Sequence, residues 1–416
     1  MPRSTGLFSL WVVAIALAAT GFVVASKYVR PAPPKNIVMA TGSVDGAYHA
    51  WGMRLADALA EDRIELTLRP TAGSNENLAL LAAGEVDLAL AQGGTRTDDP
   101  DLRSLASLFF EPVWIFHRTE VVPEGLADLT SLRTSIGPEG SGTRALLLEL
   151  LALNGLEGRE LGDLTTTAAA DALLAGELDA AVFVASERAA ILDRLMTSDE
   201  LQLLDLDRAP AYHLQRRFIA AVILPEGAID LARNVPPAAV DLAAVAANLV
   251  ADDSLHPALV DLVLLKASRL DEDSLFAPRG TFPSPRHVSL PLDEGAEIFH
   301  EQGPSFLQRV LPFWAATLIN RAIVLLLPLV ALIIPMAKAF PPLYRWRVRS
   351  RIYRWYDDLQ ALERASREGA DAAPLVARAD AIESEVDQVA TPLSYADELY
   401  DLKLHIDFVR RRIRSR

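Results

Sequence analysis

The chain of 416 residues contains no cysteine. Disulfides, thiolate zinc sites, iron–sulfur clusters and cysteine nucleophiles are therefore excluded. Histidine is scarce: there are seven, and no two lie at His-x-x-x-His spacing, which argues against a histidine zinc site. The sequence also lacks a Gly-Lys-Ser/Thr phosphate loop and a Gly-x-Ser-x-Gly elbow. We therefore expect a protein that is not an enzyme and holds no metal or cofactor.

Positive charge is also in short supply. The chain has 40 Lys and Arg and 55 Asp and Glu, for a net charge of -15. This charge argues against nucleic acid as a partner. Residues 31–309 carry most of the imbalance, with 21 basic and 42 acidic residues. Residues 338–416 hold 15 basic and 13 acidic residues. This division predicts a separate acidic domain and a near-neutral tail.

The first long apolar run is Leu7–Ala25, which carries no charge. Its 19 residues suffice to cross ~30 Å of hydrocarbon. Val23-Val24-Ala25 also fits a signal-peptide cleavage site, so cleavage stays open. The run is longer than the ~7–15 residues usual in a signal peptide, which favours an uncleaved transmembrane anchor.

A second apolar run, Ala322–Ala337, predicts a transmembrane helix over 318–337. A buried core helix is the alternative. The flank favours a membrane span, because six cations and no acid follow before Asp357: Lys338, Arg345, Arg347, Arg349, Arg351 and Arg354. Such a flank marks a cytoplasmic end. We therefore expect a membrane protein with residues 31–309 extracytoplasmic and the tail, 338–416, cytoplasmic.

Strand-like and helix-like segments alternate in the outer domain, which predicts an α/β fold with a mostly parallel sheet. The runs LALLAAGEVDLAL (78–90) and ALLAGELDAAVF (172–183) resemble each other and suggest two lobes. The expected strands are 36–40, 64–69, 86–91, 113–117, 134–137, 180–185, 201–204 and 218–224. The expected helices are 47–61, 74–83, 143–154, 168–175, 186–195, 238–251 and 257–270.

Three loops that each precede a helix are candidate ligand sites: residues 41–48, 72–77 and 137–144. Their glycines allow close approach of backbone N–H groups, and helix N-termini favour carboxylates. A plain N-cap is the alternative for each serine.

The run GSVDGAYHAWGMRLADAL followed by AGSNENLALLAAGEVDLALAQGG resembles the TAXI group of solute receptors for TRAP transporters. Glu111-Pro112 and the Gly137–Thr143 segment match two further motifs of that family. The resemblance covers residues 36–290. It implies a two-lobed type II periplasmic-binding-protein fold, a small carboxylate or amino-acid ligand, a TRAP-type membrane permease as partner, and a location at the bacterial cytoplasmic (inner) membrane.

The matched loops give the expected ligand-binding residues. On the first lobe they are Ser43, Tyr48, Ser74, Asn75 and Gln92, and on the second Ser141, Thr143 and Arg144. Arg144 is the cation of these loops, so we expect it to pair with a ligand carboxylate, with a solvated surface arginine as the alternative. Glu111 is expected to brace the hinge.

Two features depart from the family. Val44-Asp45 stands where small residues are usual, and the added carboxylate would repel an anionic ligand or pair with an amine. The second apolar run and the tail are additions. They also allow an alternative function, a ligand sensor that signals through the second span.

The tail carries an apolar seam at spacings of three and four: Leu399, Leu402, Ile406, Val409 and Ile413. Further stripes lie at Leu375, Ile382, Val386 and Val389, and at Ile352, Tyr356 and Leu359. We expect three short helices in a local bundle, and an intermolecular coiled coil is the alternative.

Overall fold

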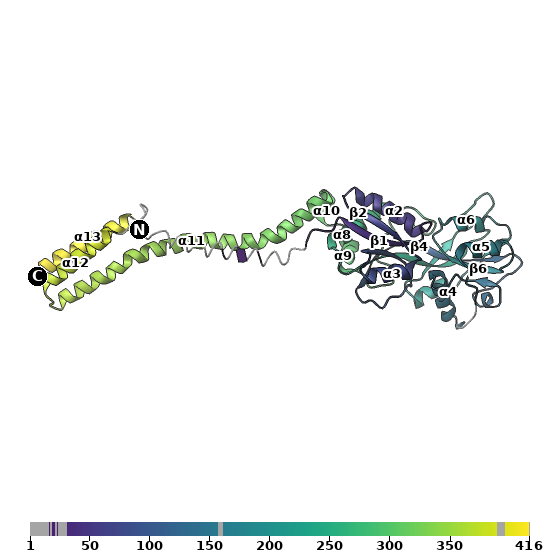
Figure 1. Ribbon diagram of the computed structural model, residues 1–416, viewed down its shortest axis with the longest axis horizontal. Coiled ribbons are helices and arrows are strands. Elements are labelled where there is room, and N and C mark those ends of the chain that lie inside the picture. The colour runs from purple at the N-terminus through teal and green to yellow at the C-terminus, as the bar shows by residue number, and fades with distance from the viewer. Residues whose placement is uncertain are drawn as a thin grey trace. The chain divides into compact units, whose positions relative to one another are not determined.

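A computed structural model of the chain describes residues 31–156, 161–388 and 396–415, together with positions 16, 19, 20 and 23. The chain divides into two compact units. One is Pro31–Ile319, and the other combines Met1–Arg30 with Asn320–Arg416. Figure 1 shows the two sets of elements. The predicted anchor at 7–25 lies outside the described residues, apart from those four positions.

The first lobe of the larger unit is built on three parallel-paired strands. Strand β1 (Asn36–Gly42) pairs with β2 (Glu65–Pro70) and with β3 (Leu88–Gln92). Helices α2 (Ala47–Ala60), α8 (Pro257–Leu270) and α9 (Glu294–Gln302) pack on one face of this sheet. Helix α3 (Ser74–Ala82) covers the other face (Figure 1). The sheet is therefore covered on both faces, which explains why β1 and β3 are buried along most of their length, whereas the edge strand β2 alternates between exposed and buried positions.

The second lobe repeats this layering. Its strands are β5 (Thr134–Ser135), β6 (Ala180–Val184), β7 (Leu201–Leu203) and β8 (Ala220–Leu224). One core holds side chains of α4 (Gly142–Leu153) and α7 (Ala209–Gln215). The opposite core holds those of α5 (Thr166–Leu174) and α6 (Ala190–Met196), and a 3-10 turn, η1, spans Asp128–Thr130.

Two long antiparallel strands run through both lobes. Strand β4 (Leu102–Arg118) pairs with β9 (Val240–Asp252) in its first part and with β6 and β7 in its second. Strand β9 also pairs with β3 in the first lobe and with β8 in the second. The sheet order is β2-β1-β3-β9-β4-β6-β5. The α/β class is confirmed, but the sheet is mixed rather than mostly parallel.

The prediction of a helix at 238–251 is wrong, because this segment forms β9. Its alanines favour a helix in isolation. In the fold β9 lies between β3 and β4, and 11 of its 13 residues are buried. Small side chains suit a strand that is packed on both faces and paired along both edges, so tertiary packing overrides helix propensity.

The remaining predicted elements of the larger unit are present within a few residues, except that α6 begins at Ala190 rather than at 186. The first eleven residues of β4 were not predicted, nor were α7, α9 and α10 (Phe306–Val310). Helices α7 and α10 have 7 and 5 residues, too few for a helical periodicity to stand out.

The tail begins within one helix, α11 (Phe313–Arg367), that runs for 55 residues. The predicted span at 318–337 is therefore part of a longer helix rather than an element of its own. Among the described residues, no helix meets the length and hydropathy required to cross a membrane.

Helices α12 (Ala372–Asp387) and α13 (Ala396–Arg414) complete the tail. The predicted seam residues Leu402, Ile406, Val409 and Ile413 are buried, and they pack in one core with Trp355 and Leu359 of α11 and Ile382 and Val386 of α12. The seam therefore closes an intramolecular bundle. Val389, from the second predicted stripe, lies outside the described residues, and the side chain of Ile352 is not described.

Candidate functional site

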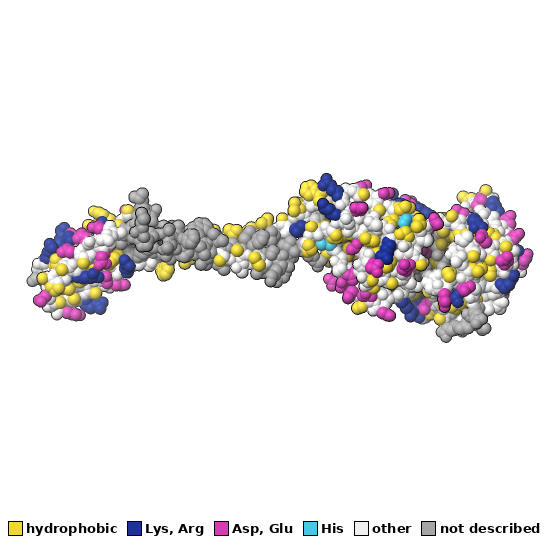
Figure 2. Space-filling view, viewed as in Figure 1, with side chains coloured by type: hydrophobic (Ala, Val, Ile, Leu, Met, Phe, Trp, Pro, Cys, Tyr) yellow, Lys and Arg dark blue, Asp and Glu magenta, His cyan; other side chains and the backbone are white. Residues whose placement is uncertain are grey.

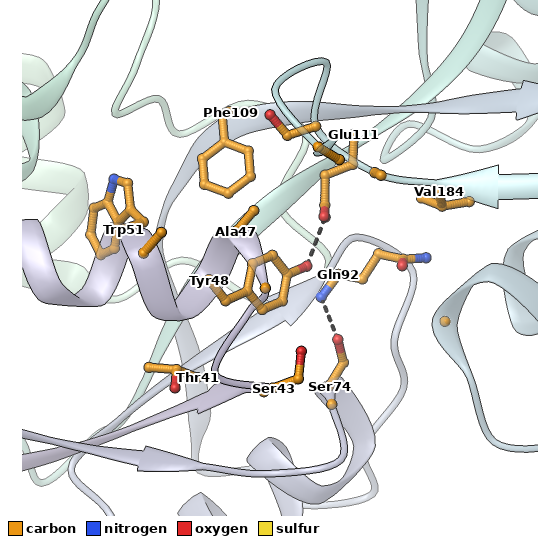
Figure 3. A pocket seen from close by; sticks show the side chains of 18 of the residues that line it. Thr41, Ser43, Ala47, Tyr48, Trp51, Ser74, Gln92, Phe109, Glu111 and Val184 are labelled. Atoms are coloured by element: carbon orange, nitrogen blue, oxygen red, sulfur yellow. Dashed lines mark hydrogen bonds between the residues drawn. The ribbon is translucent and has the colours of Figure 1, made fainter. Parts of the chain in front are cut away.

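A pocket of about 1530 Å³ lies between the two lobes. All three predicted loops line it, each at the start of a helix: α2, α3 and α4. The crossing strand β4 supplies Phe109 and Glu111 at its base, and Figure 3 shows several of these side chains facing one another. The N-termini of three helices thus converge on one cavity, which favours binding of a negatively charged group there.

The first two loops are held together by the hydroxyl of Thr71. This oxygen accepts hydrogen bonds from the Gly42 and Gly73 backbone N–H groups, at 3.1 and 3.2 Å, and donates to the Asn77 side chain. Asn77 is fully buried and donates in turn to the Leu90 carbonyl at 2.6 Å. Gly42 has φ +83° and Gly73 φ +136°, conformations that L side chains rarely adopt. The two glycines are therefore required by the shape of this wall.

Ser74 and Gln92 meet at the end of β3. The Ser74 hydroxyl accepts a hydrogen bond from the Gln92 backbone N–H at 2.9 Å (Figure 3). The Gln92 side chain is 8% exposed and reaches the N-terminus of α4 in the other lobe, where a Cβ on Gly142 would lie 2.8 Å from its Cδ. Gln92 therefore contacts the opposite lobe and also lines the pocket.

The third loop is shaped by Ser141 and Arg144. The Ser141 hydroxyl caps α4 by accepting from the Arg144 backbone N–H at 3.2 Å. The Arg144 guanidinium donates to the carbonyls of Gly137 and Gly162, at 3.2 and 3.4 Å. Arg144 is not among the residues that line the pocket. It supports the loop from behind, which differs from its predicted pairing with a ligand carboxylate.

Glu111 and Tyr48 are two titratable groups of the pocket with perturbed pKa values. The Glu111 carboxylate is 6% exposed and accepts a hydrogen bond from the Tyr48 hydroxyl at 2.7 Å (Figure 3). Burial raises the pKa of Glu111 to about 7, although the bond from Tyr48 opposes this shift. Burial and then the neighbouring Glu111 raise the pKa of Tyr48 well above its usual value, so the phenol stays the donor.

The lobes touch across the pocket at several points. The Asn75 side chain donates to the Gly140 carbonyl at 2.8 Å, which joins the second and third loops. At the rim, Glu272 of the first lobe accepts from Arg188 of the second at 2.5 Å and from Arg54 at 3.0 Å. We refer to this arrangement, in which these contacts join the two lobes, as closed.

Seven of the eight predicted residues line this one pocket: Ser43, Tyr48, Ser74, Asn75, Gln92, Ser141 and Thr143. Sequence reasoning did not find the rim residues Arg54, Arg188 and Glu272, which lie in unremarkable helical and loop contexts. It noted Glu111 but assigned it only to the hinge. In the described part of the chain, no group of three or more His, Asp or Glu side chains is placed to hold a metal.

Residues 39–303 match the model of the NMT1-like family. The match covers more than half of the chain, so the protein belongs to the NMT1-like family.

Several solved structures match part of the chain at low identity and low TM-score. PhnD1 from Prochlorococcus marinus (MIT 9301) in complex with methylphosphonate is 15% identical, with 58% of this chain and 88% of that chain covered and a TM-score of 0.40. The effector-binding domain of QuiR with shikimate is 13% identical, covering 56% and 96%, at a TM-score of 0.37. The BenM effector-binding domain with benzoate is 10% identical, covering 57% and 93%, at 0.36. Values this low assign no ligand to this chain.

Proposed function

We propose that the protein is a membrane-tethered extracytoplasmic receptor that captures a small organic acid or amino acid and delivers it to a TRAP-type permease. The interlobe pocket, with three helix N-termini converging on it, is the observation that carries the proposal. Two lobes joined by long continuous strands can open and close around a solute. Binding rather than catalysis is proposed.

The charges of the pocket favour an amino acid over a dicarboxylate. The lining contains seven acidic residues and three arginines. Each of these arginines is ion-paired: Arg54 and Arg188 with Glu272, and Arg194 with Asp171. A ligand carboxylate would therefore rely on backbone N–H groups at helix N-termini, while the Glu111 carboxyl offers a partner for a ligand amine.

Calorimetric titration of the purified chain against panels of organic acids and amino acids tests capture and ligand class together. We expect saturable binding of at least one amino acid. Asp45→Ala should weaken binding of an amine-bearing ligand about threefold and tighten binding of a dicarboxylate, because Asp45 is an exposed charge in high dielectric. Arg144→Ala is the matched control and should leave affinity unchanged, because its bonds serve loop carbonyls rather than the pocket. Absence of binding across both panels would contradict the receptor function.

Membrane tethering is supported by the uncharged run at 7–25 and by the exposed apolar side chains of α11. Leu318, Ile323, Leu326, Val330 and Ile334 are each about half exposed. Exposed apolar surface on successive helical turns is costly in water and is stabilised in lipid. The cations after Ala337 favour a cytoplasmic tail.

The absence of native cysteine makes topology directly testable. Single cysteines replace the exposed residues Ser254 and Ser415, and intact cells are labelled with an impermeant thiol reagent. We expect labelling at 254 and none at 415 until the cells are permeabilised, because the tail would lie behind the membrane. The reverse pattern would refute the proposed orientation, and equal labelling of both sites in intact cells would refute tethering across the membrane.

A ligand sensor is the second candidate, and α11 is the observation that favours it. This one helix contributes Phe313 to a core of the binding unit and Trp355 and Leu359 to the core of the tail. A continuous helix is a physical link through which closure could bias the tail. Sensing predicts that ligand changes the protection of tail amides against hydrogen exchange, whereas a delivery role does not require it.

A further inference from the structure

Helix α13 has a second apolar stripe opposite its buried seam. Tyr400, Leu404 and Phe408 are 64%, 53% and 58% exposed. They lie four residues apart, so they follow one line along the helix. The core residues Leu402, Ile406, Val409 and Ile413 occupy the other side. Large apolar side chains in a continuous exposed line are unusual on a solvated helix and mark an interaction surface.

The neighbouring helices leave this stripe uncovered. On one side of it, His405 stacks edge-on against Tyr356 of α11, with centroids 5.5 Å apart. On the other side, Lys403 pairs with Asp387 of α12 at 2.5 Å. The stripe lies between these two contacts on the outer surface of the bundle. Hydrophobic side chains are visible among the charged ones on the surface of this unit (Figure 2).

The charges at the two ends of the stripe are opposite in sign. Asp397 lies one turn before Tyr400, and Arg411 lies one turn after Phe408. The order Asp397, Tyr400, Leu404, Phe408, Arg411 has spacings of 3, 4, 4 and 3, which are symmetric about Leu404. Arg411 is 80% exposed, and among the described residues its ion pair is with Asp407 of its own helix at 2.6 Å. Asp407 also accepts from Arg410 at 2.6 Å, so its own charge is compensated locally.

We propose that the stripe Tyr400–Leu404–Phe408 is a homodimer interface, in which α13 of one chain packs antiparallel on α13 of a second copy about a two-fold axis at Leu404. A two-fold interface requires a surface that is complementary to itself. Antiparallel pairing about Leu404 places Tyr400 against Phe408 of the partner and Asp397 against Arg411 of the partner. A parallel pairing would instead place Asp397 against Asp397 and Arg411 against Arg411, which is repulsive.

The interface is short, because Asp397–Arg411 covers 15 residues or about 21 Å of helix. One helix pair buries less than the roughly 1,200 Å² of the smaller stable interfaces, so a weak dimer is expected in dilute solution. The interface does not depend on the identity of the solute.

Cross-linking of the full-length chain tests the pairing and its direction. The chain has no native cysteine, so single cysteines at Tyr400, Leu404 or Phe408 provide unambiguous positions. With a short cross-linker that carries two thiol-reactive groups, Leu404→Cys should give a dimer, because this residue lies opposite its own copy in the second chain, across the two-fold axis. Tyr400→Cys alone and Phe408→Cys alone should not, because each then lies about 12 Å along the axis from its copy. A mixture of these two variants should cross-link.

Charge and stripe variants supply the energetic test by sedimentation of the full-length chain. Leu404→Asp should raise the dimer dissociation constant at least tenfold, because each substitution enters a two-fold interface twice. Ala377→Asp is the matched control, since it adds the same charge to an exposed position of the neighbouring helix α12, away from the stripe. Asp397→Arg should weaken the dimer, and Asp397→Arg with Arg411→Asp should restore it. Circular dichroism confirms that each variant stays folded.

Two results would overturn the proposal. One is a chain that remains monomeric at about 100 μM and gives no Leu404→Cys product above the level of a cysteine at Ser415, since interfaces weaker than that supply under about 6 kcal/mol. The other is self-cross-linking of Tyr400→Cys with the same yield as Leu404→Cys, which indicates parallel pairing.

Discussion

Replacing Glu111 with glutamine is expected to stabilise the binding unit at alkaline pH and to leave it unchanged in acid. The pKa of Glu111 is about 7 in the folded protein against an ordinary value of 4.5. Between these values the folded state holds a proton that the unfolded state has released. Wild-type stability should therefore fall as pH rises from 4.5 to 7, by roughly 3 kcal/mol at 1.36 kcal/mol per pKa unit, and stay flat above 7. Glutamine carries no ionisable group and removes this loss.

Chemical denaturation of the wild type and Glu111→Gln between pH 4.5 and pH 8 measures the difference. The free energy of unfolding of the variant should exceed that of the wild type by roughly 3 kcal/mol at pH 8, relative to their difference at pH 4.5. Glu139→Gln is the matched control, because Glu139 is an exposed acid on another wall of the same pocket. Parallel stability curves for the wild type and Glu111→Gln would show that burial does not raise the Glu111 pKa.

The same carboxyl group separates the two ligand classes. A ligand amine needs the ionised form of Glu111, so its affinity should fall about tenfold per pH unit below 7. A dicarboxylate is repelled by the ionised form, so its affinity should rise as pH falls. Affinity of Glu111→Gln should be independent of pH over this range in either case. The pH dependence of binding thus identifies the ligand class even when the affinity is modest.

The parts of the fold that the sequence predicts well are those whose burial is periodic and local. Helix α8 matches its predicted bounds of 257 and 270, because Pro257 sets its start and its apolar positions recur at helical spacing. Strand β9 was missed because its alanines carry no period that distinguishes a buried strand from a helix. Only its pairing with β3, β4 and β8 decides the conformation.

The candidate site, too, could be predicted from the sequence only in part. Glycine-containing loops before helices are visible in the sequence, and seven of the eight predicted residues line one pocket. The direction in which a side chain points cannot be read from the sequence. Arg144 lies at the start of α4 as expected, but the path of the loop from Gly137 brings carbonyls behind it, and its guanidinium turns to them. The Tyr48–Glu111 pair joins residues 63 apart, a proximity that only the crossing strand creates.

Replacing Gly142 with valine is expected to hold the lobes apart without unfolding either of them. Gly142 is the first residue of α4, and a Cβ there would lie 2.8 Å from the Gln92 Cδ and 3.0 Å from its Nε2. Separation of the lobes relieves this overlap if the Gln92 side chain does not swing into the pocket that it lines. The closed contact between Asn75 and Gly140, two residues earlier, should then break. Each lobe keeps its own core, so the midpoint of thermal unfolding should change little.

The opening is measurable without knowledge of the ligand. Spin labels on single cysteines at Ser254 in the first lobe and Leu231 in the second, both exposed, report the distance between the lobes. We expect a longer distance in Gly142→Val and at least about tenfold weaker binding of any solute that the wild type binds, since the loss of one closed-state hydrogen bond and of one wall costs about 1.4 kcal/mol or more. Gly125→Val is the matched control, because a Cβ at Gly125 meets nothing within 4 Å. An unchanged distance with unchanged affinity would mean that Gln92 relaxes around the valine and that the contact between Gln92 and Gly142 does not control closure.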